Sequence, residues 1–205
     1  MSSTRHLPRD ERWHTEIPSP VGALRIVAGT AAIVGVYHGD HTPVPPQALL
    51  GCRASLPAGA AAPGPLEAPA STVPVESATP DATVALLRQA AAELGGYFAG
   101  LRREFEVPIE LQGTAFQLAV WTTLTRIPYG QRRSYRDIAG DLGNPAMGRA
   151  IGAAVRVNPV SIIVPGHRVV SSTGAVIGYA AGPETKTALL DLESGPVPAP
   201  PEGGA

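Results

Sequence analysis

Short runs rich in apolar and β-branched residues, typical of strands, occur near the start of the chain. Turn-forming residues separate these runs at Ser19-Pro20-Val21-Gly22 and at Gly29-Thr30. The pattern therefore predicts a short β-meander, with strands at Trp13 to Ile17, Leu24 to Ala28 and Ala32 to Tyr37.

A helix is predicted after this small sheet. Between Asp81 and Ala99, apolar residues recur at spacings of three and four, and Gly100 follows as a stop signal. The apolar face consists of Val84, Leu87, Ala91, Leu94 and Phe98. We expect this face to cover the sheet, and residues 105–111 to form one more strand or an extended connection.

The region between the meander and the helix has a different composition. Residues 42–80 are rich in Pro and Ala, with nine prolines from Pro43 to Pro80 and almost no periodic apolar signal. Such a segment cannot bury enough apolar surface to offset the entropy lost on ordering it. We therefore predict a linker or long loop that contains Cys52, and a disordered Pro- and Gly-rich tail at residues 194–205.

Capping signals open two helices in the second half of the chain. Thr114 with Gln117, and Ser134 with Asp137, both have the spacing of a capping box, in which the first side chain caps the helix and the second reaches back. The first of these helices is predicted to end at Pro128-Tyr129-Gly130, where proline and glycine interrupt the helical pattern.

A third helix follows closely enough to make a helix-turn-helix candidate. Gly143 can adopt the left-handed conformation that ends a helix, and Asn144-Pro145 can cap and start the next, which is predicted to reach Val157. This helix is rich in small residues: Ala146, Gly148, Ala150, Gly152, Ala153 and Ala154. They permit either close packing against a neighbouring helix or entry into a DNA minor groove about 6 Å wide, and the sequence leaves both open.

Charge separates the two halves, although the whole chain has a formal charge of −1. Residues 1–112 carry eight Arg against eleven acidic residues, whereas residues 113–193 carry seven Arg and one Lys against five. Seven arginines and only two acidic residues lie between Arg126 and Arg168. This local excess could face a phosphate backbone, or it could be scattered surface charge.

The composition excludes several kinds of site. Cys52 is the only cysteine among 205 residues, which rules out an internal disulfide framework and the usual cysteine-based zinc site. His14, His38 and His41 have no CxxC or HxxxH partner, so we predict no metal and no cofactor. No apolar stretch approaches the roughly 20 residues of a spanning helix. We expect a cytoplasmic protein that does not bind membranes.

A specific motif follows Asn158-Pro159. An apolar run at Val160 to Val164, predicted as a buried strand, leads into Pro165-Gly166-His167-Arg168-Val169. Further motifs are Phe116-Gln117, Val120-Trp121, Ile127-Pro128-Tyr129-Gly130, Ser134-Tyr135, Arg149-Ala150-Ile151-Gly152, Gly178-Tyr179, Lys186 and Glu193. Together they resemble the O6-alkylguanine-DNA alkyltransferase family, whose reactive loop reads Pro-Cys-His-Arg-Val.

The resemblance implies a mixed α/β (α+β) fold in two domains. A small N-terminal sheet-plus-helix domain is expected at residues 1–112. A helical DNA-binding domain, with a winged-helix-like helix-turn-helix, is expected at residues 113–193, where the resemblance is strongest.

The resemblance also implies how the chain meets DNA. Arg149 resembles the finger that enters the duplex through the minor groove and fills the space of an extruded guanine, and Tyr135 resembles the residue that rotates the nucleotide's phosphate outward. Arg136 and Arg156 are expected to contact the DNA beside them. Extrusion is needed because a protein nucleophile cannot reach the O6 atom of a stacked, paired guanine.

The remaining matches imply a proton relay and a pocket. His167 and Glu193 resemble the last two members of a Cys–His–Glu relay in which the thiol loses its proton and the thiolate attacks the alkyl carbon. Asn158 resembles the residue that braces this site. The pocket for the extruded base is expected to be lined by Pro165, Val169, Tyr179 and Ala180.

Position 166 departs from the family pattern, because glycine has no side chain to deprotonate or alkylate. Cys52 lies about a hundred residues away in the predicted loop, with no His or Arg pattern around it, and is expected to be an inert thiol. His167 would have to give up its orienting role to accept an alkyl group, and the nearby serines have no second base placed for them: Ser161, Ser171 and Ser172.

Three functions remain open on this basis. The first is a non-catalytic protein, resembling the alkyltransferase-like group, that recognises O6-alkylguanine in duplex DNA and presents it to nucleotide excision repair proteins. The second is a methylated-DNA–protein-cysteine methyltransferase whose cysteine has been replaced in this chain. The third is a DNA-binding regulator without lesion preference. We expect a monomer that associates with the nucleoid when bound to DNA.

Overall fold

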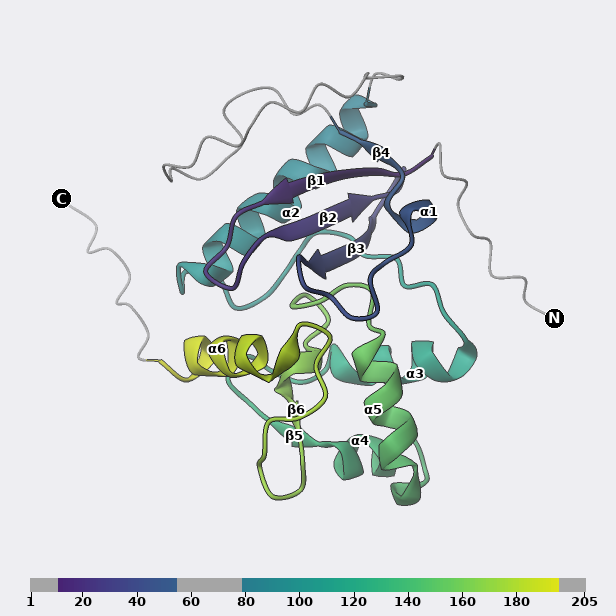
Figure 1. Cartoon of the computed structure of the whole chain (residues 1–205), viewed down its shortest axis with the longest axis vertical. Helices are drawn as coiled ribbons and strands as arrows, with labels where there is room; N and C mark the ends of the chain where they lie inside the picture. The colour runs from purple at the N-terminus through teal and green to yellow at the C-terminus, as the bar shows by residue number, and fades with distance from the viewer. Residues whose placement is uncertain (1–10, 55–78, 196–205) are drawn as a thin grey trace.

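The predicted meander forms an antiparallel sheet at one end of the molecule (Figure 1). The computed structural model describes residues 11–54 and 79–195. Three strands pair in chain order: β1 (Trp13–Ile17), β2 (Leu24–Ala28) and β3 (Ile33–His38). Gly22 takes a φ of +93° in the turn between β1 and β2, a conformation that favours glycine. The apolar runs and the turn residues therefore predicted the meander to within one residue.

Strand β3 lies at an edge of the sheet, yet all six of its residues are buried, because other segments cover this edge. Ile33 N–H donates to Pro108 O, and Val36 N–H donates to Pro159 O, both at 2.8 Å. Residues 105–111 thus form the extended connection that was one of the two predicted alternatives, with an isolated bridge from Ile109 to Ile33.

Part of the segment predicted as a loop is ordered, so that prediction was wrong for residues 47–53. It contains helix α1 (Gln47–Leu50) and strand β4 (Cys52–Arg53), which pairs in parallel with β1. The cause is backbone hydrogen bonding, which apolar periodicity does not report: Cys52 N–H donates to Arg12 O at 2.8 Å. Residues 55–78 of the predicted loop lie outside the described residues.

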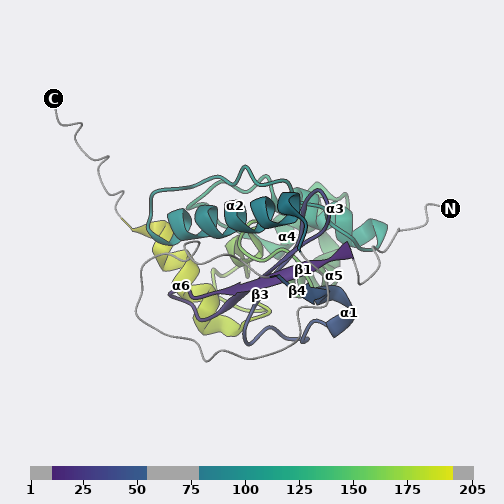
Figure 2. The same cartoon turned by 90° about the horizontal axis from the view of Figure 1, so that it is seen from above.

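Helix α2 (Asp81–Phe98) covers one face of the sheet, as predicted (Figure 2). Its buried face differs from the expected one, since only Leu87 and Leu94 belong to both. The buried residues are Thr83, Leu87, Ala90, Glu93, Leu94 and Tyr97. The face is rotated because Glu93 and Tyr97 turn inward to satisfy hydrogen-bonding groups of other segments, which an apolar pattern cannot reveal.

The helix-turn-helix prediction is confirmed by the C-terminal half. Helices α3 (Ala115–Leu124) and α4 (Tyr135–Asp141) begin with the two predicted capping boxes, both of them complete. Gly143 ends α4 with a φ of +86°. The next helix begins later than predicted, because its first turn is the 3-10 helix η2 (Pro145–Met147), and α5 (Gly148–Arg156) follows.

The strand predicted at residues 160–164 is absent, so that prediction was wrong. These residues form a tight turn in which Ile162 has a φ of +73°, and only isolated bridges are present. The chain continues through η3 (Gly166–Arg168) and β6 (Val169–Val170), which pairs in parallel with β5 (Arg133–Ser134). The last helix is α6 (Gly182–Ser194), so the predicted tail begins after Ser194. Residues 196–205 lie outside the described residues.

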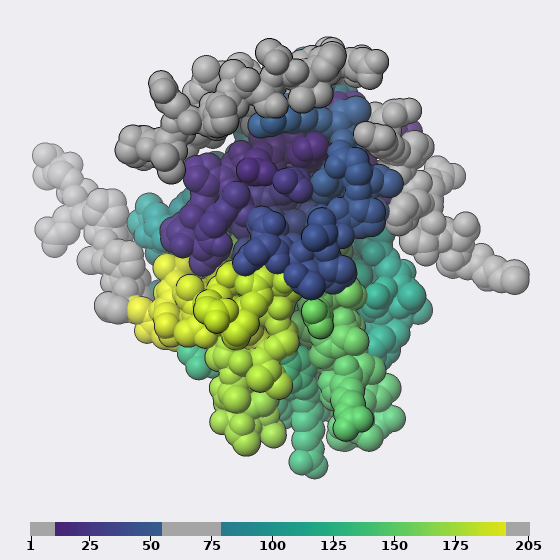
Figure 3. Space-filling model, viewed as in Figure 1, coloured from purple at the N-terminus to yellow at the C-terminus, as the bar shows by residue number. Residues whose placement is uncertain are grey.

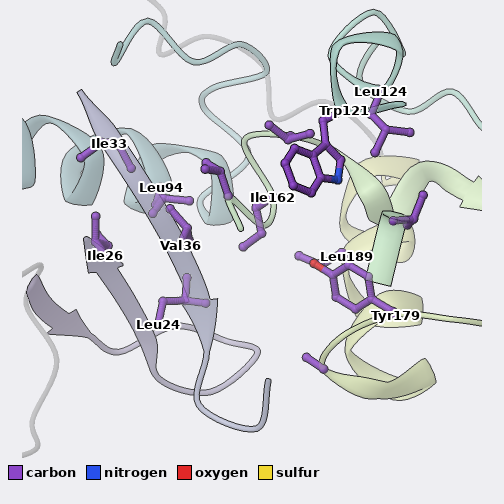
Figure 4. Packing of buried hydrophobic residues seen from close by; sticks show 14 of the residues in the cluster. Leu24, Ile26, Ile33, Val36, Leu94, Trp121, Leu124, Ile162, Tyr179 and Leu189 are labelled. Atoms are coloured by element: carbon purple, nitrogen blue, oxygen red, sulfur yellow. The ribbon is translucent and has the colours of Figure 1, made fainter. Parts of the chain in front are cut away.

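One buried apolar cluster joins the sheet to the C-terminal helices (Figure 4). Ile33 and Leu94 belong to the first half, and Trp121, Ile162 and Leu189 to the second, and all five are at most 2% exposed. The two predicted domains therefore share a core. Within the described ranges, no helix is both long and apolar enough to cross a membrane.

Candidate functional site

The centre of the predicted site is a buried turn. Pro165, Gly166, His167 and Arg168 are all buried, and the last three form η3. Because β6 follows at once and pairs with β5, the turn is tied to the residues that start α4. The motif is therefore held between the helix-turn-helix and the core.

Glu193 on α6 accepts hydrogen bonds from several residues in and around this turn. Its Oε1 accepts a hydrogen bond from His167 Nε2 at 2.8 Å and from the Tyr97 hydroxyl at 2.9 Å, and Arg168 donates to both carboxylate oxygens. The backbone N–H of Gly130 donates to Oε2 at 3.1 Å. Burial alone raises the pKa of Glu193, but hydrogen bonds from His167 and Arg168 outweigh it and lower the pKa to about 2.

The same arrangement sets the protonation of His167. Its ring is fully buried, and this desolvation lowers its pKa despite the opposing hydrogen bond to Glu193. A carboxylate can only accept a hydrogen bond, so Nε2 of the neutral ring carries the proton. Nδ1 is then the basic nitrogen, and it has no hydrogen-bond partner among the described residues. His167 thus presents a free lone pair beside Gly166.

Asn158 braces the turn through both ends of its amide. Its Nδ2 donates to Val164 O at 2.8 Å, and its Oδ1 accepts from Val160 N–H at 3.1 Å. The role of Asn158 in bracing a reactive site stays a prediction. A Cβ at Gly166 would lie 3.2 Å from Val155 Cγ1 and 3.6 Å from Asn158 Nδ2, so a side chain there requires a small shift of Val155.

An open cavity of about 990 Å³ lies between the helix-turn-helix and the loop that follows β6. Arg136, Arg149 and Arg156, the three predicted DNA contacts, all line it and are all exposed. None of the three forms a salt bridge with another described residue. Thr42 and Pro43 of the N-terminal half also line this cavity, which we call the α4–α5 cavity.

Tyr135 lies in the wall of the α4–α5 cavity, and its hydroxyl has hydrogen bonds with Ile177, Gly178 and Lys186. Its hydroxyl donates to Ile177 O at 2.7 Å, and Lys186 Nζ donates to the Tyr135 hydroxyl at 3.3 Å and to Ile177 O at 2.6 Å. Desolvation lowers the pKa of the buried Lys186 to about 8. No role was predicted for Lys186 from the sequence, although it is the only lysine in a chain with fifteen arginines.

The small residues of η2 and α5 line the α4–α5 cavity: Ala146, Gly148, Gly152 and Ala153. A Cβ at Gly152 would lie 3.7 Å from the Tyr135 ring, and one at Gly148 would lie 4.0 Å from Tyr135 Cβ, which are ordinary contact distances. Tyr135 therefore lies against α5 without requiring glycine at either position, and the choice between close packing and minor-groove entry stays open.

The residues predicted to form the base pocket are placed deeper than the α4–α5 cavity. Pro165, Val169, Tyr179 and Ala180 are all buried, and none of them lines this cavity. Their neighbours Ile177 and Gly178 do line it, and Pro165 instead lines a second cavity of about 630 Å³ beside Arg168. Their role in holding a base stays a prediction.

Comparison with known proteins assigns this architecture to a family. Residues 115–195 match the family model "6-O-methylguanine DNA methyltransferase, DNA binding domain". The chain is 47% identical over 106 residues to a methylated-DNA–protein-cysteine methyltransferase of Methanosarcina acetivorans, covering 52% of this chain and 68% of that protein. The chain belongs to the methylated-DNA–protein-cysteine methyltransferase family.

Other members of this family extend the comparison. The inducible methyltransferase of Bacillus subtilis is 55% identical over 103 residues, which cover 50% of this chain and 58% of that protein. The alignment thus spans little more than half of that relative. The crystal structure of Mycobacterium tuberculosis OGT in complex with DNA has a TM-score of 0.70 and 32% identity, covering 88% of this chain and 92% of that chain. The mixed α/β fold expected from the resemblance is confirmed.

Two of the residues that donate hydrogen bonds to Glu193, Tyr97 and Arg168, were not predicted to do so from the sequence. Tyr97 lies 96 residues before Glu193 and on α2 of the other half, and it carries no motif. Arg168 belongs to the quoted motif, but its role as a donor to both carboxylate oxygens depends on where α6 places Glu193. Only the three-dimensional structure brings these groups together.

Cys52 lies apart from the Gly166 turn. It lies on β4, at the edge of the sheet opposite β3, whereas β3 is the strand that contacts the turn at residues 159–161. Three strand spacings separate β4 from β3, which corresponds to roughly 14 Å. That Cys52 has no part in the site stays a prediction, and Cys52 lies on a strand and not in the predicted loop.

Four histidines of the folded chain predict a loss of stability in acid. Burial lowers the pKa values of His38 and His41 from 6.5 to about 4, and those of His14 and His167 move in the same direction. Between pH 6.5 and about 4 the unfolded chain therefore binds protons that the folded chain does not. Stability is full above this window and falls through it, by up to about 1.4 kcal/mol per histidine per pH unit.

Denaturant unfolding at several pH values across this window tests the expectation. The slope of unfolding free energy against pH should be positive in the parent protein. It should be shallower in the double variant His38→Gln and His41→Gln, which keeps polar groups but cannot titrate. Identical slopes in the two proteins would show that other groups cause the loss.

Proposed function

We propose that this protein recognises O6-alkylguanine in duplex DNA by extruding the damaged nucleotide, and that it holds the lesion without accepting the alkyl group. The observation that carries the proposal is Gly166. It stands where the family motif has its reactive cysteine, in a site whose remaining parts are assembled.

The electrostatics of the α4–α5 cavity support DNA binding. We place the DNA-binding domain at residues 113–193, which carry three more basic than acidic residues. Arg136, Arg149 and Arg156 leave their guanidinium groups exposed around one concave surface, where phosphates can be bound without breaking a salt bridge. A solved relative from M. tuberculosis was crystallised in complex with DNA.

The geometry of the helix-turn-helix supports extrusion. Arg149 lies in the first turn of α5 and projects at the cavity, so it can enter a duplex seated there and fill the space of a displaced base. Tyr135 lies against the same helix on the cavity wall. Unpairing costs a few kcal/mol and costs least at a damaged base, which is one source of preference for the lesion.

The chemistry of the turn argues against transfer. Glycine supplies no acceptor at position 166, and Cys52 lies on the far edge of the sheet. The buried imidazole of His167 is a poor acceptor, because displacement of an alkyl group from an ether oxygen favours a softer nucleophile. These features support recognition of the lesion without transfer of its alkyl group.

Paired binding measurements test the proposal. Two duplexes that differ only in one O6-methyl group are titrated with the protein at the same salt concentration, since phosphate contacts make affinity depend on salt. We expect tighter binding to the methylated duplex. Equal affinities would instead support a DNA-binding regulator without lesion preference.

Replacing Arg149 by Ala should selectively remove the preference for the lesion. We expect affinity for the methylated duplex to fall about tenfold or more, which corresponds to at least about 1.4 kcal/mol, and affinity for the undamaged duplex to fall less. Arg156→Ala, on the same helix, is the control and should weaken both duplexes by a similar factor. If Arg149→Ala lowers affinity for the two duplexes by the same factor, Arg149 contacts phosphate only and does not contribute to the preference for the lesion.

A further inference from the structure

The N-terminal half contacts the cavity through the segment that leaves β3. This β3 exit segment, residues 38–43, lies against the loop of residues 177–180 in the C-terminal half, and the space-filling view shows the two chain regions in contact (Figure 3). Thr42 N–H donates to Ala180 O at 2.7 Å. His38 Nε2 and the Tyr179 hydroxyl share a hydrogen bond of 3.0 Å across 141 residues of sequence.

Both partners of the second contact are withdrawn from water. His38 is 3% exposed and Tyr179 is 8% exposed. A buried donor or acceptor without a partner destabilises the folded state, because its lost hydration is not replaced. This hydrogen bond therefore strongly favours one position of the Tyr179 ring. The His38 and Tyr179 rings also meet edge to face, with centroids 5.5 Å apart.

The 177–180 loop passes from an exposed half to a buried half at a glycine, because Ile177 and Gly178 are exposed whereas Tyr179 and Ala180 are buried. Gly178 has a φ of +62°, and Ile177 and Gly178 are exposed at the α4–α5 cavity. On one side of this glycine, Tyr135 and Lys186 bind the carbonyl of Ile177. On the other side, His38 and Thr42 bind Tyr179 and Ala180. The C-terminal half thus binds the loop at Ile177 and Gly178, and the N-terminal half binds it at Tyr179 and Ala180.

We infer that His38 is a positioning residue for lesion recognition, through which the N-terminal half fixes the Tyr179 wall of the base pocket. This inference rests on the proposed function, because it assigns the 177–180 loop to the extruded base. Thr42 and Pro43 complete the same contact at the rim of the α4–α5 cavity. The N-terminal half then determines how well the pocket discriminates the lesion.

Substitution of His38 tests the inference. His38→Leu removes the hydrogen bond, whereas His38→Gln can retain it. We expect His38→Leu to weaken binding to an O6-methylguanine duplex about tenfold, as loss of one buried hydrogen bond worth about 1.4 kcal/mol would do, and to change binding to the undamaged duplex by less than about twofold. His38→Gln should restore most of the preference.

The control is His41→Leu, which removes another buried histidine of the same segment. The His41 ring packs edge to face on Tyr37, with centroids 5.1 Å apart, and makes no hydrogen bond to the 177–180 loop. We expect His41→Leu to change the melting temperature but not the ratio of the two affinities. An equal loss of preference in this variant would overturn the inference.

A variant of the other hydrogen-bond partner shows whether the effect of His38→Leu comes from the lost hydrogen bond or from misfolding. Tyr179→Phe removes only the hydroxyl, and it should reproduce the loss seen with His38→Leu. The double variant should lose no more than either single variant, because the two changes remove the same interaction. Additive losses would show that His38 and Tyr179 act independently, which would contradict the inference.

A measurement without DNA separates this inference from the proposed function. Backbone hydrogen exchange of Thr42 and Gly182, whose N–H groups donate to Ala180 O and Tyr179 O, should become faster in His38→Leu than in the parent protein and should stay slow in His38→Gln. Unchanged exchange would overturn the inference even if the lesion preference of the parent protein is found. If exchange becomes faster but the parent protein shows no lesion preference, the proposed function fails while the positioning of the loop stands.

Discussion

Gly166→Cys is expected to convert the protein into one that takes up about one alkyl group per molecule, slowly, from O6-methylguanine DNA. The neutral His167 ring has its Nε2 committed to Glu193 and its Nδ1 without a partner, so Nδ1 can take the thiol proton. The thiolate then attacks the methyl carbon, the bond from that carbon to O6 breaks, and guanine leaves with the electron pair.

The space at position 166 allows this test. The new Cβ would lie 3.2 Å from Val155 Cγ1, so Val155 must shift by a few tenths of an ångström. Gly166→Ala introduces the same Cβ without sulfur and is the matched control. Label from the DNA methyl group should appear on the cysteine variant only.

Absence of transfer by a folded Gly166→Cys variant that still binds the lesion would show that the His167–Glu193 pair is not poised for proton removal. Val155→Ala can be added to relieve crowding. Uptake of label by Gly166→Ala would point to an acceptor elsewhere in the chain.

Glu193→Gln is expected to lower the free energy of unfolding by about 3–5 kcal/mol, because it leaves the buried Arg168 guanidinium without its counter-charge. The variant keeps the size of the side chain, so lost packing contributes little. Urea unfolding of the parent and variant proteins at neutral pH measures the difference.

Glu16→Gln provides the matched control for this prediction. The pair between Arg25 and Glu16 is 3.1 Å long, like the contacts of Glu193, but its side chains are 35% and 47% exposed. Water screens such a pair, so its loss should cost no more than about 1 kcal/mol. If both substitutions cost the same, burial of Glu193 would not explain its importance.

The sequence predicted best the features that neighbouring residues determine. The capping boxes at Thr114 and Ser134, and the left-handed Gly143, are decided within a few positions along the chain, and the structure contains all three. The strand predicted at residues 160–164 failed because its apolar side chains suit any buried segment. The side-chain amide of Asn158 holds this segment as a turn instead.

Contacts between distant segments could not be predicted from local sequence patterns. The resemblance led to the pairing of His167 with Glu193, although the two residues are 26 positions apart. Neither Tyr97 nor His38 carries a signal in the sequence, because each acquires its partner only when the two halves pack together. The prediction of a loop at residues 47–53 was wrong for a similar reason, since β4 forms by pairing with β1.

The most direct test of the central claim is to find where the methyl group resides after binding. The parent protein is incubated with equal amounts of an undamaged duplex and a duplex that carries a labelled O6-methyl group, and the complex is isolated and then denatured. We expect the retained DNA to be enriched in the methylated duplex, with the label still on the DNA. Label on the protein, or equal retention of the two duplexes, would contradict the account.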